Sequence, residues 1–174
     1  MLVVPRYGMV SSHIQPQGTH AIAKRFPCLG EIHRAFIDRQ RVFFTASAGP
    51  NTRINVSPRA TDAFRVLDDR TVAYLDRTGS GNETAAHLRA GGRLTVMFCA
   101  FDGPPDILRL YGRGEVLHRH GQAIADVLRA SFGGKTPLGT RQIIRVDVDL
   151  VQTSCGFGVP LFDDRGERVA RPMD

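Results

Sequence analysis

The stretch VAYLDRTGSGNETAAHL, residues 72–88, joins an apolar run to a short amphipathic segment through a turn rich in glycine and small polar residues. It has a purely structural interpretation, because Ser80 and Glu83 have the spacing of a capping box at a helix start. Asn82 is an alternative cap. It also has a functional interpretation, since a strand that ends at Asp76, a glycine-rich turn and a helix start direct backbone N–H groups at one point, where an anion can bind. The stretch alone leaves both interpretations open.

The turn matches neither of two common phosphate-binding fingerprints. Thr84 occupies the position of the third glycine in the dinucleotide-binding fingerprint, and the Gly-Lys-Ser/Thr ending of a Walker loop is missing. A phosphate bound here must therefore be held by a different architecture.

The stretch RINVSPR, residues 53–59, favours the functional interpretation. Its residues alternate as in a strand, and Ile54 and Val56 share one face. The other face is polar and consists of Arg53, Asn55 and Ser57, with Arg59 just beyond. A solvated strand face explains the arginines well, but it explains Asn55 poorly because asparagine is depleted in strands. A row of arginine, amide and hydroxyl donors suits a phosphate or a polar ring edge.

The rest of the chain predicts a mainly β fold with short helices. Helical spacing of apolar residues occurs in 31–40 and 121–132, and a third short helix follows the glycine-rich turn. Strand patterns occur at 41–47, 53–59, 64–67, 71–76, 93–102, 107–117 and 142–152. Because most of these strands form hairpins, we expect an antiparallel sheet that closes into a small barrel. Gly112 and Gly114 lie inside a strand and predict a bulge or sharp bend.

The composition fits one domain of 174 residues with 42% hydrophobic residues. We expect residues 1–30 to be an extension of uncertain order and residues 31–174 to be the domain. Apolar runs of about 18 residues are missing, so we expect no membrane span. Three widely spaced cysteines favour a reducing, cytoplasmic location. The net charge is +6, but the arginines form no run, which makes nucleic-acid binding an unfavoured interpretation.

The order of these elements resembles the pyridoxamine 5′-phosphate oxidase-like family of FMN-binding split barrels, over roughly residues 35–155. The resemblance implies a split β-barrel of antiparallel, Greek-key-like topology. It also implies a homodimer that holds FMN across its interface. The implied cofactor-binding residues are Arg53, Asn55, Val56 and Ser57 in the first element, and Tyr74, Leu75, Asp76, Thr78, Gly79, Ser80, Asn82 and Thr84 in the second.

Two departures from the family pattern bear on activity. Gly81, Asn82 and Glu83 follow Ser80 where the oxidase has an arginine and a lysine, so two positive charges are missing. The C-terminal segment from Ser154 onward lacks the arginine and histidine that seat pyridoxal in the oxidase. The resemblance therefore implies an FMN-dependent oxidoreductase with an unknown small-molecule substrate. Two alternatives stay open: the same barrel with deazaflavin or haem, and a non-enzymatic ligand-binding module.

Other titratable residues carry weaker signals. His87 is expected at the helix surface, and Asp147 and Asp149 on an outward strand face. His118 and His120 have a spacing that could ligate a metal, but no third ligand is evident in the sequence. Cys155 is interpreted as a packed thiol, with a redox partnership to the flavin as the alternative.

Overall fold

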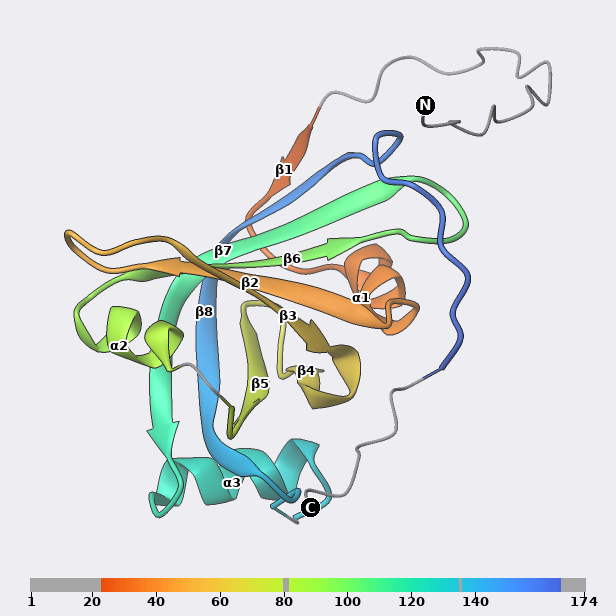
Figure 1. Ribbon diagram of the computed structural model, residues 1–174. Coiled ribbons are helices and arrows are strands. Elements are labelled where there is room, and N and C mark those ends of the chain that lie inside the picture. The colour runs from red at the N-terminus through yellow and green to blue at the C-terminus, as the bar shows by residue number, and fades with distance from the viewer. Residues whose placement is uncertain (1–22, 80–81, 135, 167–174) are drawn as a thin grey trace, which may run out of the picture.

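The structure is a computed structural model that describes residues 23–79, 82–134 and 136–166 (Figure 1). Its described part contains eight strands, three α-helices and one 3-10 helix. In chain order these are β1 (Lys24–Phe26), α1 (Glu31–Asp38), β2 (Val42–Ala48), β3 (Asn55–Ala60), η1 (Thr61–Ala63), β4 (Phe64–Val66), β5 (Thr71–Arg77), α2 (Glu83–Arg89), β6 (Arg93–Cys99), β7 (Asp106–His118), α3 (Gln122–Ser131) and β8 (Thr140–Cys155). Within these described ranges, no helix combines the length and apolar character needed to cross a membrane.

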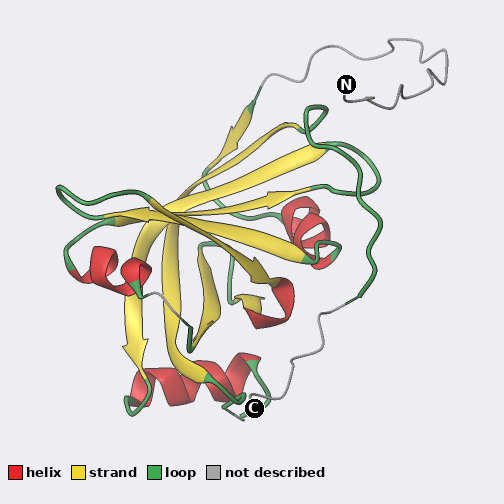
Figure 2. Cartoon of the chain, in the orientation of Figure 1, coloured by secondary structure: helices red, strands yellow, loops and turns green. Residues whose placement is uncertain are grey.

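All the strands pair antiparallel in one curled sheet, in the order β3-β2-β6-β7-β8-β5-β4, with β1 paired to β8. The sheet curls into an open barrel, with α1 and α2 at opposite sides of the strands and α3 across one end (Figure 2). The predicted split β-barrel is therefore confirmed.

The long strands β7 and β8 bend at a bulge, as the glycines in β7 predict. Their register shifts between Tyr111 and Gly112. A Cβ atom on Gly112 would lie 2.3 Å from the carbonyl oxygen of Asp147, so only glycine allows this close approach. Gly114 likewise leaves room for Leu88 of α2, since a Cβ atom there would lie 2.5 Å from a Leu88 methyl carbon. The absence of a side chain at Gly114 thus lets α2 pack against β7.

Two apolar clusters lie on the two faces of the central strands. The main cluster centres on four aromatic rings, whose neighbouring centroids lie 5.1 to 5.7 Å apart: Phe43, Phe64, Tyr74 and Phe98. The second cluster packs α3, through Ile124 and Leu128, against Leu75 and Ile143. Strands β5 and β8 are therefore buried on both faces, which fixes the register between them.

The start of α2 differs from the capping-box interpretation in its N-cap residue, and Ser80, the other member of that box, lies outside the described residues. The helix begins at Glu83, so Asn82 is the N-cap residue and Glu83 is the first helical residue. A capping box needs its acid at the third helical position. The Asn82 side chain makes no capping bond, and its amide oxygen instead accepts a hydrogen bond from Gln142 at 2.9 Å.

The expected N-terminal extension is described only from residue 23 on, and residues 1–22 lie outside the described part. Strand β1 adds to the edge of β8, with Phe26 opposite Val151. Leu29 is only 3% exposed and belongs to the main core. A three-residue strand is too short to give a periodic pattern, so the sequence did not predict it.

Candidate functional site

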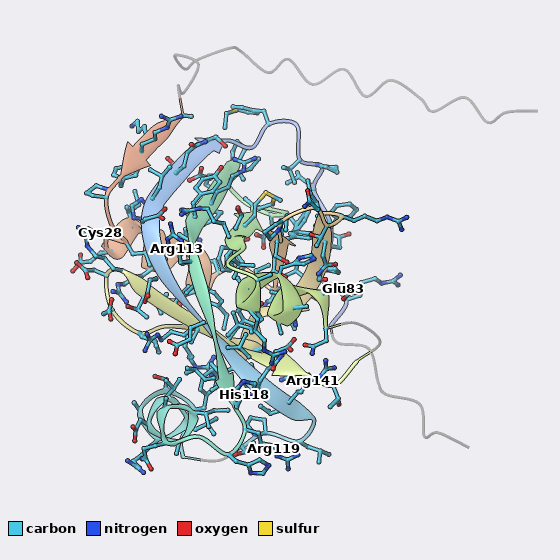
Figure 3. All side chains as sticks on the ribbon, turned by 90° about the vertical axis from the view of Figure 1, so that its left-hand side faces the viewer. Cys28, Glu83, Arg113, His118, Arg119 and Arg141 are labelled. Atoms are coloured by element: carbon cyan, nitrogen blue, oxygen red, sulfur yellow. The ribbon has the colours of Figure 1, made fainter. Side chains whose placement is uncertain are left out.

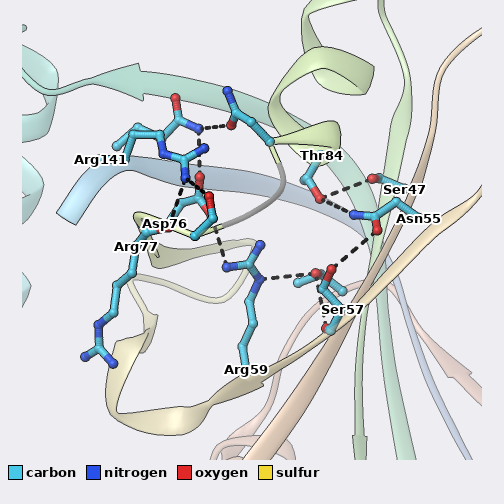
Figure 4. Close-up of polar contacts among 12 residues, drawn as sticks. Ser47, Asn55, Ser57, Arg59, Asp76, Arg77, Thr84 and Arg141 are labelled. Carbon is cyan, nitrogen blue, oxygen red and sulfur yellow. Dashed lines mark hydrogen bonds and ion pairs between the residues drawn. The ribbon is translucent and has the colours of Figure 1, made fainter. Parts of the chain in front are cut away.

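A pocket of about 410 Å³ lies between β3, the end of β5 and the start of α2, where the sequence places its two candidate elements (Figure 4). Its walls are Asn55, Ser57, Pro58, Arg59, Asp76, Arg77, Gly79, Asn82, Glu83 and Thr84. The polar face of β3 points into this pocket because strand residues alternate, and its apolar face points out. The pocket is therefore lined almost entirely by polar groups.

Arg59 and Asp76 form the charged centre of the pocket. Nη1 of Arg59 lies 3.0 Å from Oδ1 of Asp76, and Nε of Arg59 donates to Oγ1 of Thr45 at 3.3 Å. The guanidinium carbon lies 4.8 Å from the centre of the Tyr74 ring, a cation–π contact. The second oxygen of Asp76 accepts a hydrogen bond from Nε2 of Gln142 at 2.7 Å. Both charges are thus paired and held in place, and Nη2 of Arg59 makes no hydrogen bond to the described residues.

A chain of hydroxyl and amide groups borders the other side of the pocket. Oγ1 of Thr84 accepts hydrogen bonds from Ser47 at 3.3 Å and from Nδ2 of Asn55 at 3.2 Å. Ser47 also contacts Nδ1 of His87 at 3.0 Å, and Ser57 donates to Oδ1 of Asn55 at 3.4 Å. Because the oxygen of Thr84 already accepts two bonds, its own hydrogen can donate into the pocket.

Tyr74 lies in the core beneath Arg59 and is fully buried. Its hydroxyl has no hydrogen-bond partner among the described residues. Thr45 and Thr84 lie near enough to influence the hydroxyl, but neither forms a hydrogen bond of normal geometry with it. Burial raises the pKa of Tyr74 well above its usual value, against the opposing effect of Arg59. The phenol therefore stays neutral and supports Arg59 by its ring.

The turn after β5 is held by β8. Nη2 of Arg141 donates to the carbonyl oxygen of Gly79 at 3.2 Å. Figure 3 shows that Glu83 on α2 and Arg141 on β8 lie on the same side of the molecule. Glu83 is exposed at the pocket rim, so the rim carries one negative charge in addition to the paired charges inside.

The structure brings together six of the sequence-predicted residues in the pocket wall: Asn55, Ser57, Asp76, Gly79, Asn82 and Thr84. Arg53 is exposed and lies outside the wall, and Val56 is 61% exposed on the opposite face of β3. Tyr74 and Leu75 are buried behind the wall. Thr78 is exposed and its N–H group donates to Gly139, while Ser80 lies outside the described residues.

The predicted set omits five residues that shape the pocket: Thr45, Ser47, Arg59, His87 and Gln142. Thr45 and Ser47 lie on the same face of β2 as buried Phe43. Polar side chains on this inner face could have indicated in the sequence that they line a site. The expectation that His87 lies at the surface is wrong, because it is only 6% exposed. It lies three residues after Thr84, on the same helix face.

The remaining candidates have simpler roles. Asp147 and Asp149 are exposed, as expected, and pair with Arg145 and Arg93. Cys155 is exposed, so its interpretation as a packed thiol is wrong. Across the described ranges, no three His, Cys, Asp or Glu side chains form a group that could hold a metal ion.

Comparison with known proteins relates the sequence of this chain to one protein family. Residues 29–155 match the family model described as pyridoxamine 5′-phosphate oxidase. The chain is 48% identical, over 128 residues, to the pyridoxamine 5′-phosphate oxidase family protein ustO of Aspergillus flavus. That match covers 72% of this chain and 51% of the relative, so the chain spans about half the length of the curated relative.

Solved structures share the fold at low sequence identity. A candidate pyridoxamine 5′-phosphate oxidase from Lactobacillus delbrueckii is 17% identical, with a TM-score of 0.57 over 72% of this chain and 94% of that chain. HupZ of Group A Streptococcus is 15% identical, with a TM-score of 0.53 over 70% of this chain and 91% of that chain. At these identities the likeness concerns the fold alone.

Proposed function

The chain belongs to the pyridoxamine 5′-phosphate oxidase family, and we propose that it is an FMN-binding flavoprotein that oxidises or reduces a small molecule. The observation that carries this proposal is the convergence of hydrogen-bond donors from β3 and α2 on one pocket of about 410 Å³. The volume lies within the range of small-molecule sites.

The donor set fits a phosphate group. Three groups keep a hydrogen for a ligand: Nη2 of Arg59, the hydroxyl of Thr84 and the second hydrogen on Nδ2 of Asn55. Asp76 does not oppose an anion strongly, because Arg59 and Gln142 occupy its two oxygens. Glu83 at the rim repels an anion and therefore lowers the affinity of the pocket for phosphate.

The pocket supports a flavin over a haem. Haem iron is held in proteins by histidine, cysteine, methionine or tyrosine side chains. Among the described residues, the pocket wall contains none of these four types. Deazaflavin also needs hydrogen-bond donors to its phosphate and to its ring edge, so it is a competing ligand. Its absorbance spectrum distinguishes it from FMN.

In the proposed complex the chain binds and orients the cofactor. Arg59, Asn55 and Thr84 hold the phosphate, and the buried Asp76–Gln142 pair keeps Arg59 in position. When bound, FMN would accept and donate a hydride or electrons, which protein side chains cannot do. We leave the substrate unassigned. A reducing, cytoplasmic location suits the three unpaired cysteines.

We also propose that the protein acts as a homodimer through the outer face of β3. Strand β3 is a sheet edge. Val56 on its outer face is 61% exposed, and Ile54, just before the strand, is 73% exposed. Exposed apolar side chains on an edge strand favour association. A second copy would cover them beside the pocket. Analytical ultracentrifugation tests this, with Val56→Lys expected to give monomers.

An FMN titration of the cofactor-free protein tests the proposed function. Thr84→Val removes one hydroxyl at nearly constant shape, and we expect the dissociation constant for FMN to rise roughly tenfold or more, as for loss of a hydrogen bond to a charged group. Thr78→Val is the matched control, because Thr78 is exposed and outside the pocket wall. Equal FMN affinities for the two variants and the wild type would reject this assignment of the pocket.

A further inference from the structure

A second pocket, of about 390 Å³, lies at the other end of β8, between β1, α1 and the turn that joins β6 to β7. Strand β8 contacts the proposed FMN pocket at Gln142, near its start, and reaches the second pocket at Cys155, its last residue. The two pockets share no wall residue. Whatever binds in the second pocket therefore does not touch the first.

His33 lines the second pocket and has a buried ring nitrogen without a hydrogen-bond partner among the described residues. The side chain is 4% exposed, and its Nδ1 accepts a hydrogen bond from the N–H group of Gly30 at 2.9 Å. This bond leaves the hydrogen of the neutral ring on Nε2. Nε2 is buried and has no hydrogen-bond partner among the described residues. A buried N–H group without an acceptor costs free energy. A ligand in the pocket that His33 helps to line could supply this acceptor to Nε2.

The charged and titratable groups that line the pocket together with His33 come from every element that forms it, and Asp106 among them acts electrostatically on His33. They are Lys24 on β1, Arg39 after α1, Asp106 at the start of β7 and Cys155 at the end of β8. Burial lowers the pKa of His33 although Asp106 opposes the shift, and burial raises the pKa of Asp106. With His33 neutral, the two cations and one acid leave an excess of one positive charge.

Apart from Thr153 and Ser154, the rest of the wall is apolar. Phe26 and Phe36 border the pocket together with Leu108 and two prolines, and Ile32 stands at its rim with 76% of its side chain exposed. The ring of Phe26 contacts the His33 ring edge to face at 4.7 Å. A ligand that fills this space needs an apolar body and one acceptor group that carries negative charge.

From the unpartnered Nε2 of His33, the apolar walls and the single excess positive charge, we propose that this pocket is a binding site for a small monocarboxylate with an apolar body. The carboxylate accepts a hydrogen bond from Nε2 of His33 and lies near the ammonium group of Lys24. Its apolar body packs between Phe26 and Phe36.

Three probes of similar size and different charge test the proposal: benzoate, benzamide and benzylamine. Each is titrated into the full chain while the imidazole resonances are followed by NMR, with His33→Gln used to assign the His33 signals. We expect benzoate to shift the His33 signals saturably, benzamide to bind more weakly and benzylamine not to bind. No shift with benzoate, or equal shifts with benzylamine, would overturn the proposal.

Two neighbouring residues of β1 provide a matched pair of variants. Lys24 lines the pocket, whereas Arg25 is also exposed and does not line it. We expect Lys24→Met to weaken benzoate binding about two- to fivefold, as for one solvent-exposed charge contact, and Arg25→Met to leave it unchanged. Equal weakening in both variants would mean that benzoate responds to the overall charge of the protein and does not occupy this pocket.

Discussion

Nη1 of Arg59 on β3 lies 3.0 Å from Oδ1 of Asp76 on β5, and the side chains of the pair are only 20% and 9% exposed. Strands β3 and β5 are not neighbours in the sheet. The pair therefore joins the two sides of the open barrel at the pocket. It fixes one cation where a phosphate is proposed to bind.

Asp76→Asn tests the structural role of this pair. Loss of the carboxylate leaves Arg59 partly buried without a counter-charge, and we expect the free energy of unfolding to fall by about 2 to 4 kcal/mol. Urea denaturation measures it. Asp62→Asn is the control, since the Asp62–Arg77 pair is about half exposed on both sides, and its loss should cost less than about 1 kcal/mol. Equal costs would show that burial of the Arg59–Asp76 pair is unimportant.

Glu83→Gln should tighten FMN binding. The substitution removes the only unpaired negative charge of the pocket wall as described, and we expect the dissociation constant to fall about two- to fivefold at low salt. The gain should shrink as ionic strength rises. Glu31→Gln is a matched control, because Glu31 is the exposed first residue of α1 just as Glu83 is of α2. An unchanged affinity for Glu83→Gln would place the phosphate elsewhere.

Tyr74→Phe should make the protein more stable at high pH. The Tyr74 hydroxyl is buried without a partner, so its removal should cost nothing or add up to about 1 kcal/mol at neutral pH. Because burial raises the folded-state pKa, the unfolded chain loses this proton first, at about pH 10. The wild type should therefore lose stability above about pH 10, and Tyr74→Phe should lose less. Parallel stability curves for the two proteins would contradict this.

Ser47→Ala should weaken the hydroxyl chain behind the pocket. It leaves Nδ1 of His87 without its partner in a buried position, so we expect a loss of about 1 to 3 kcal/mol in the free energy of unfolding. Ser131→Ala, at the partly exposed end of α3, should change stability by less than about 0.5 kcal/mol. A similar small change for Ser47→Ala would mean that water satisfies His87.

The sequence predicted the elements of this fold better than the contacts between them. Alternation in the hairpins and the glycines of β7 follow from local backbone rules, and the structure has both. The start of α2 does not follow from local rules alone, because the amide of Asn82 bonds to Gln142, which β8 places beside it. No local pattern records that pairing of distant residues.

The candidate site shows the same division. The alternation of polar and apolar residues predicted the polar face of β3, and this face lines the pocket. Arg59 lies on that face, but its partner Asp76 depends on how the barrel curls. The partner of His87 on α2 is Ser47 on strand β2, which is distant in the sequence. Contacts of this kind arise from tertiary packing, which periodicity in one segment cannot reveal.

The most direct test of FMN binding is the visible absorbance spectrum of the freshly purified protein, followed by FMN titration of any colourless fraction. We expect a flavin spectrum in the purified protein, or saturable uptake of FMN that Thr84→Val weakens and Thr78→Val does not. A haem spectrum, or a colourless protein that takes up no FMN, would contradict this expectation.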